Sequence, residues 1–174
     1  MSRTRGRSVA QPPRSMLVVD VSDRQRLLRV SAAGLERLVR KALIAEGVER
    51  AEIGVILVDD RRIAAVHRRW LGLPGPTDVI TFDLSAGNAG PPQAAALAGD
   101  IVVSTETARR MARTVGWTPR QELAYYVIHG VLHLTGYDDR EPVDRRAMRA
   151  RERAVMKACG LPAPPRTRSA GATA

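Results

Sequence analysis

Two patterns of apolar residues divide the chain into candidate strands and helices. Short runs of apolar, largely β-branched residues predict buried strands, whereas apolar residues that recur every three or four positions predict helices with one buried face. The first pattern predicts four strands, at residues 16–21, 53–58, 78–84 and 100–103. Before the last of them, residues 85–98 are rich in Gly, Pro and Ala and predict a flexible loop.

Each of the first three predicted helices begins beside a residue that can cap it. Ser31 precedes the first helix, which ends near Gly47. Asp59 or Asp60 precedes the second helix, and Ser104 precedes the third. Capping residues therefore predict where these helices start without reference to any functional motif.

The fourth predicted helix carries the most informative chemistry. Thr118 is a candidate N-cap, Pro119 suits the first helical position, and Gln121 supplies the third-position partner of a capping box. A helix that begins here runs through His129 and His133. The capping residues place both histidines on one helix.

The four-residue spacing of these histidines predicts a divalent metal site. On a helix this spacing puts both imidazoles on one face, with Cβ atoms about 5 to 6 Å apart. Gly136 suits a reversal of the chain that would bring Asp139 round as a third ligand. Two imidazoles and one carboxylate leave a coordination position open, which is typical of catalytic zinc. Simple hydrogen-bonded histidines are the alternative, but the glycine and the acid follow at metalloprotease intervals.

Position 130 weighs against peptide hydrolysis. The metalloprotease motif H-E-x-x-H places its general base directly after the first histidine, where this chain has Gly130. The predicted helix therefore offers no carboxylate at that position to deprotonate an attacking water. A metalloprotease-like hydrolase stays open as the weaker alternative.

A final helix is predicted from Pro142 to about Ala158, ended by Gly160. Basic residues outnumber the acids Glu141, Asp144 and Glu152 in this region; they are Arg140, Arg145, Arg146, Arg149, Arg151, Arg153 and Lys157. A solvated face accounts for most of them, and a few could form a phosphate-facing edge.

The length and composition favour one domain in a reducing compartment. A chain of 174 residues with 44% hydrophobic residues can fill one core, which we expect within residues 16–160, between disordered tails at 1–15 and 161–174. A single cysteine, Cys159, excludes an internal disulfide and a cysteine-rich zinc ribbon. No apolar stretch approaches the roughly 18 residues of a membrane span, so we expect a soluble, cytoplasmic protein without a membrane partner.

The net charge of +10 favours an anionic partner such as nucleic acid. Part of this charge lies in the two tails, which carry six arginines and leave +4 on the body: Arg3, Arg5, Arg7, Arg14, Arg166 and Arg168. Basic disordered tails are an alternative explanation, so charge alone is only suggestive of RNA.

Three segments together resemble the YbeY family, bacterial endoribonucleases also called rRNA maturation factors. They are residues 75–82 (GPTDVITF), 99–108 (GDIVVSTETA) and 129–139 (HGVLHLTGYDD), in the family's order. The resemblance implies a zincin-like single α+β domain, in which a small four-stranded mixed sheet packs with about five helices and the metal site lies on a helix. It also implies one zinc ion and hydrolysis of single-stranded RNA during 16S rRNA 3′-end maturation and ribosome quality control.

The same resemblance suggests partners. The substrate would be an rRNA precursor in the small ribosomal subunit, with ribosomal proteins or an assembly GTPase as further candidates and no DNA. A non-catalytic ribosome-binding assembly factor is an alternative function.

Two residues depart from the family pattern. Asp139 stands where the family has a third histidine; a carboxylate also binds zinc, but its charge could shift the preference toward Mn²⁺ or Fe²⁺. Leu71 stands where many members have an arginine. Arg68 or Arg69 could replace that arginine in neutralising phosphate charge.

The catalytic hypothesis therefore combines a metal held by His129, His133 and Asp139 with Arg68 or Arg69 as the phosphate-neutralising group.

Several further residues have two possible interpretations. Asp138 is either a proton acceptor or a surface turn residue, and His67 is either a substrate contact or, as favoured here, a half-exposed helical residue. Thr77 and Asp78 line the cleft only by the resemblance, and sequence chemistry alone places them at the start of a strand.

Overall fold

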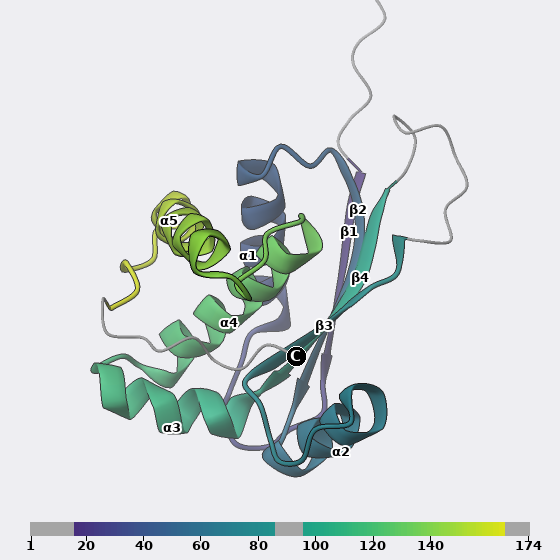
Figure 1. Cartoon of the computed structure of the whole chain (residues 1–174), viewed down its shortest axis with the longest axis vertical. Helices are drawn as coiled ribbons and strands as arrows, with labels where there is room; N and C mark the ends of the chain where they lie inside the picture. The colour runs from purple at the N-terminus through teal and green to yellow at the C-terminus, as the bar shows by residue number, and fades with distance from the viewer. Residues whose placement is uncertain (1–15, 86–95, 166–174) are drawn as a thin grey trace, which may run out of the picture.

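The computed structural model describes residues 16–85 and 96–165, which form four strands and five helices (Figure 1). Their bounds are β1 (Met16–Asp23), α1 (Ala32–Ala45), β2 (Arg50–Val58), α2 (Asp60–Leu71), β3 (Val79–Asp83), β4 (Leu97–Ser104), α3 (Thr105–Val115), α4 (Pro119–Leu134) and α5 (Pro142–Ala158). The strand order is β1-β2-β4-β3, in which β3 alone runs antiparallel to its neighbour. The expected α+β domain with a four-stranded mixed sheet is confirmed.

The helices are divided unequally between the two faces of the sheet (Figure 1). On β3 and β4, Val79, Ile101 and Val103 belong to the main core, which also contains residues of α1, α4 and α5. The alternate residues Ile80 and Val102 face the other way and pack with Ile63 of α2. Side chains alternate between the faces of a strand, so α2 and α4 lie on opposite faces of the sheet.

α4 lies at the centre of the larger layer. It contacts β3, β4, α1, α3 and α5, and ten of its residues are buried. Its N-terminus has the predicted capping box, in which the Thr118 side chain accepts from the backbone of Gln121 and the Gln121 side chain accepts from the backbone of Thr118. Contacts on every side hold this helix in place, as a helix that carries a reactive site requires.

The predicted element positions agree with the structure to within a few residues. β2 and β4 begin at Arg50 and Leu97, each three residues earlier than predicted. The loop prediction at 85–98 and both tail predictions lie largely outside the described residues. Leu161 is described and packs against the core, with its N–H donated to the carbonyl of Met156. Within the described ranges, no helix is both long and apolar enough to cross a membrane.

Candidate metal centre

Glycine allows α4 to lie unusually close to the sheet. A Cβ on Gly130 would come within 2.7 Å of Ile101 Cγ2 and 3.1 Å of Thr81 Cγ2. A Cβ on Gly99 of β4 would come within 2.7 Å of the Leu134 side chain. The position that holds a glutamate in metalloproteases therefore faces the sheet in this chain and has no room for a side chain.

Gly130→Ala is expected to lower the free energy of unfolding by about 1 to 2 kcal/mol, because the cost of overpacking exceeds the gain in helix propensity. Gly34→Ala in α1 is the control, since its new methyl group would meet Ser31 at 3.3 Å and the end of the Arg37 side chain at 4.0 Å, but no residue of the sheet. Urea denaturation of both variants measures the difference. Equal stability of the two variants would contradict the close packing of α4 described here.

His129 is held from its outer side by Glu152 of α5, which in turn bonds to Tyr125 of α4. Its Nδ1 lies 2.7 Å from Oε1 of Glu152, a buried residue of α5. The same oxygen accepts a hydrogen bond from the Tyr125 hydroxyl at 2.8 Å. A carboxylate oxygen accepts hydrogen bonds, so Nδ1 carries the hydrogen, and in a neutral His129 imidazole Nε2 then keeps its lone pair.

His133 is held in a similar way by the backbone. Its Nδ1 lies 3.0 Å from the carbonyl oxygen of Tyr137, which can only accept. Burial, together with the nearby His129, lowers the pKa of His133 below its ordinary value. A neutral His133 with hydrogen on Nδ1 also keeps its lone pair on Nε2.

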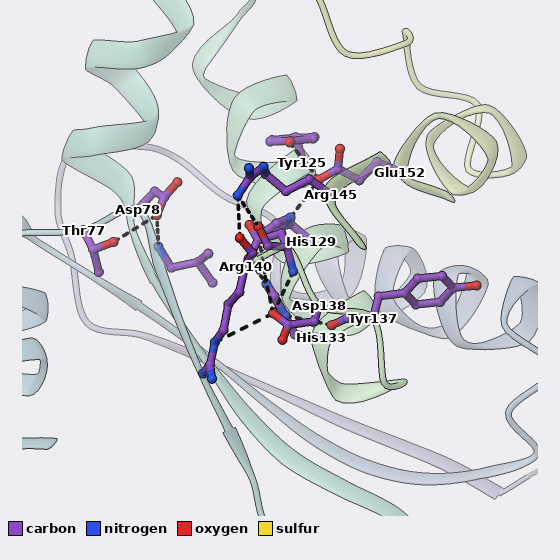
Figure 2. Close-up of polar contacts among 12 residues, drawn as sticks. Thr77, Asp78, Tyr125, His129, His133, Tyr137, Asp138, Arg140, Arg145 and Glu152 are labelled. Atoms are coloured by element: carbon purple, nitrogen blue, oxygen red, sulfur yellow. Dashed lines mark hydrogen bonds and ion pairs between the residues drawn. The ribbon is translucent and has the colours of Figure 1, made fainter. Parts of the chain in front are cut away.

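The two Nε2 atoms face each other. Nε2 of His129 and Nε2 of His133 are 3.0 Å apart, and Figure 2 shows His129 between Glu152 and His133. Two neutral imidazoles with hydrogen on Nδ1 would repel at this distance unless a proton or a metal ion lies between the two Nε2 atoms. The carboxylate of Asp139 is 3.8 Å from Nε2 of His129 and 3.9 Å from Nε2 of His133.

These separations fit a shared metal ion. Two atoms that each bind one zinc at about 2.1 Å can be at most about 4.2 Å apart, and all three separations are shorter. Ligand atoms of His129, His133 and Asp139 lie within 4.8 Å of one another, so the group could hold a divalent cation. The three residues predicted as ligands are therefore brought together.

The turn that returns Asp139 to the histidines depends on Gly136. Its φ of 99° lies in the left-handed region, as expected for the residue that reverses the chain after α4. Arg145 of α5 then donates to the carbonyl oxygens of Asp139 at 3.2 Å and Arg140 at 2.6 Å. Asp138 accepts from the backbone N–H groups of Asp139 and Arg140, so it is a turn residue with an exposed side chain.

An open hollow of about 360 Å³ lies beside His133, within the range of about 300 to 1,000 Å³ that is usual for ligand pockets. Its lining comes from β3 and from the end of α4 with the following turn: Thr81, Asp83, His133, Leu134, Gly136, Tyr137, Asp138, Asp139 and Arg140. Arg140 is thus the cationic residue of the lining. Sequence reasoning did not single it out.

Arg68 and Arg69 do not belong to this lining. Both are exposed near the end of α2, on the other face of the sheet from α4, and the Arg69 guanidinium lies 5.7 Å from the centre of the Trp70 ring. Leu71, in the place of the family arginine, also lies outside the lining. The structure therefore does not bring either predicted arginine to the candidate metal ligands.

Three other predicted positions are structural. His67 is buried, with Nδ1 3.0 Å from the carbonyl of Gly75, so the expectation of a half-exposed histidine is wrong. Thr77 donates to the Asp78 carboxylate at 3.0 Å, which also accepts the N–H of Val79 at 2.9 Å. Thr77 and Asp78 lie directly before β3 and are not part of the hollow's lining.

Comparison with known proteins assigns the family. The family described as Endoribonuclease YbeY matches residues 20–160. The chain belongs to the YbeY family. A YbeY endoribonuclease of Anaeromyxobacter dehalogenans is 45% identical over 119 residues, which are 68% of this chain and 60% of the relative. The Desulforamulus reducens protein of the same name is 37% identical over 145 residues, which are 82% of this chain and 92% of the relative.

A solved structure gives the same fold. The solution structure of TM1509 from Thermotoga maritima superposes with a TM-score of 0.55 at 26% identity, covering 83% of this chain and 89% of that protein. The YbeY-family fold therefore extends over most of the chain, although the chain spans only 60% of the Anaeromyxobacter relative's length.

Glu152, like Arg140, is a part of this YbeY-family site that sequence reasoning missed. It was counted among the charged residues of a basic helix, yet it lies on the same helix face as the buried Met148, Val155 and Met156. A lone acid among core positions is the signal that could have identified it, because buried carboxylates require a specific partner.

Proposed function

We propose that this chain is a metal-dependent endoribonuclease that cleaves single-stranded RNA. The observation that carries the proposal is the pair of facing Nε2 atoms of His129 and His133 at 3.0 Å, with the Asp139 carboxylate beside both. The family description, endoribonuclease, supports the class of reaction. The proposed setting is 16S rRNA 3′-end maturation and ribosome quality control, as the family resemblance implies.

One divalent cation per chain would be held by His129, His133 and Asp139. When bound, it would supply Lewis-acid activation of water and neutralise charge on a phosphate. Zinc suits two imidazoles and a carboxylate, and the anionic Asp139 could extend the choice to Mn²⁺ or Fe²⁺. The two histidines contribute lone pairs whose direction is already set by Glu152 and by the Tyr137 carbonyl.

Asp138 is better suited to orienting the side chain of Arg140 than to accepting a proton. The hydrogen bond from the backbone N–H of Asp139, with a second from Arg140, holds the pKa of Asp138 below its ordinary value. A carboxylate with a low pKa is a weak base at neutral pH. We assign Asp138 the orientation of the Arg140 guanidinium, whose Nε lies 3.8 Å away.

Arg140 is the proposed group that neutralises charge on the RNA phosphate. It lines the hollow together with His133 and Asp139, and its side chain is 74% exposed. Exposed ion pairs contribute little free energy, so the guanidinium can turn from Asp138 to a phosphate at small cost. Arg68 and Arg69 would then contact RNA only farther from the reacting bond.

Arg140→Ala is expected to lower kcat/KM on single-stranded RNA by about 10- to 100-fold, the effect of losing a hydrogen bond of about 1.5 to 3 kcal/mol to a charged group. Arg37→Ala, at an exposed arginine of α1 outside the hollow, is the matched control and should cleave at the wild-type rate. Kinetics on a short fluorogenic RNA measure both. A larger loss in the Arg68→Ala/Arg69→Ala double variant would transfer the role to α2.

Parallel assays on three substrates test the reaction class. Metal-loaded protein is incubated with single-stranded RNA, the same RNA in a duplex, and casein. We expect cleavage of the single strand, little of the duplex and none of casein. Casein cleavage would favour the metalloprotease alternative, and tight binding to small ribosomal subunits without RNA cleavage would favour an assembly factor. We also predict a cytoplasmic location and contacts with ribosomal proteins or an assembly GTPase.

A further inference from the structure

Glu152 differs from the other charged residues of α5 in being buried. It is only 3% exposed and lies beside the core residues Met148, Val155 and Met156, whereas Arg149 and Arg153 are exposed. Moving a carboxylate out of water costs several kcal/mol unless hydrogen bonds replace the lost hydration. The burial of Glu152 therefore depends on its partners.

Both partners of Glu152 lie on α4. Oε1 of Glu152 accepts from the Tyr125 hydroxyl at 2.8 Å and meets Nδ1 of His129 at 2.7 Å (Figure 2). Tyr125 precedes His129 by four residues and so lies on the same face of the helix, with ring centres 6.1 Å apart. One oxygen of α5 thus holds two adjacent side chains of α4.

We propose that Glu152, supported by Tyr125, is a positioning residue that fixes His129 with Nε2 directed at the cation. The inference rests on the proposed function only in requiring that the site binds metal. The carboxylate keeps hydrogen on Nδ1 and restricts rotation of the ring, as acceptors behind metal-binding histidines do in general. Glu152 touches His129 on the side away from Nε2 and is not part of the hollow's lining.

The two histidines differ in whether the group that accepts from Nδ1 can be removed by substitution. The Tyr137 carbonyl that holds His133 belongs to the backbone and cannot be removed by substitution. The contact to His129 comes from a side chain and can be removed. Glu152→Leu removes both hydrogen bonds at similar volume, whereas Glu152→Gln keeps a carbonyl oxygen that can accept from Nδ1.

The test measures Zn²⁺ affinity and the tautomer of His129 in full-length, tag-free protein. Competition with a chromophoric chelator gives the affinity, and ¹⁵N NMR of histidine-labelled, metal-free protein gives the tautomer. Glu152→Leu should bind Zn²⁺ about 10- to 100-fold more weakly and should lose the pure Nδ1–H tautomer of His129. Glu152→Gln, which keeps the acceptor oxygen but not the charge, should recover most of the Zn²⁺ affinity and the Nδ1–H tautomer. A role that depended only on the negative charge of Glu152 would not predict this recovery.

Unchanged Zn²⁺ affinity in folded Glu152→Leu, with His129 still in the Nδ1–H tautomer, would overturn the assignment. If Glu152→Leu does not fold, Tyr125→Phe decides: a loss of about threefold or more in affinity supports the assignment and an unchanged affinity overturns it. Failure of metal-loaded wild type to cleave RNA would refute the proposed function, but these affinity comparisons would still stand.

Discussion

His133→Ala is expected to lower cleavage of single-stranded RNA by at least about 10³-fold. The substitution removes one of two nitrogen ligands, and loss of the cation removes several kcal/mol of stabilisation of the transition state. The truncated side chain was buried, so the variant must be shown to be folded by its thermal unfolding transition. Initial rates on a short RNA, with protein purified without a histidine tag, give the effect.

Contaminating nuclease is the main error in such an assay, and a second histidine variant controls for it. His67 lies on α2, on the other face of the sheet, where it bonds to the carbonyl of Gly75. His67→Ala, purified identically and shown to be folded, should retain both metal and activity. Wild-type rates in a folded, metal-free His133→Ala protein would end the catalytic hypothesis.

Asp139→Ala is expected to weaken Zn²⁺ binding by more than the roughly 10- to 100-fold expected when a residue that holds a ligand, such as Glu152 behind His129, is lost. The carboxylate lies 3.8 and 3.9 Å from the two Nε2 atoms and is the only anionic group of the three candidate ligands. Two imidazoles alone would leave the cation with incomplete coordination and without a neutralising charge. Chelator competition measures the dissociation constant for each variant.

Asp139→His supplies the informative comparison, because the resemblance to the family led us to expect a histidine at this position. It should retain Zn²⁺ and bind Mn²⁺ less well than wild type, since a nitrogen ligand replaces an oxygen ligand. Equal Zn²⁺ affinity in wild type and Asp139→Ala would show that Asp139 is not a ligand, although it lies beside both histidines.

Local signals predicted most of the fold. The capping box at Thr118 and Gln121 and the left-handed turn at Gly136 depend on neighbours within a few residues, so they could be found without the structure. Strand ends were less exact, because the first residues of β2 and β4 are set by pairing with partner strands. The four-residue spacing of the histidines predicted their common face because α4 is a regular helix.

Tertiary packing decided what sequence reasoning missed. Arg68 and Arg69 were predicted to replace the arginine that is absent at Leu71, but α2 packs on the other face of the sheet from α4. His67 is buried, and its position four residues after the buried Ile63 was an available signal. Arg140 reaches the site because the chain turns back at Gly136, and Glu152 reaches it because α5 packs against α4.

A crystal structure of tag-free protein, with anomalous diffraction recorded at the absorption edge of the bound metal, tests the central claim most directly. We expect one anomalous peak per chain, about 2.0 to 2.2 Å from Nε2 of His129, Nε2 of His133 and a carboxylate oxygen of Asp139. A metal-loaded protein whose peak lies elsewhere, or whose His129 and His133 do not bind the same ion, would contradict it.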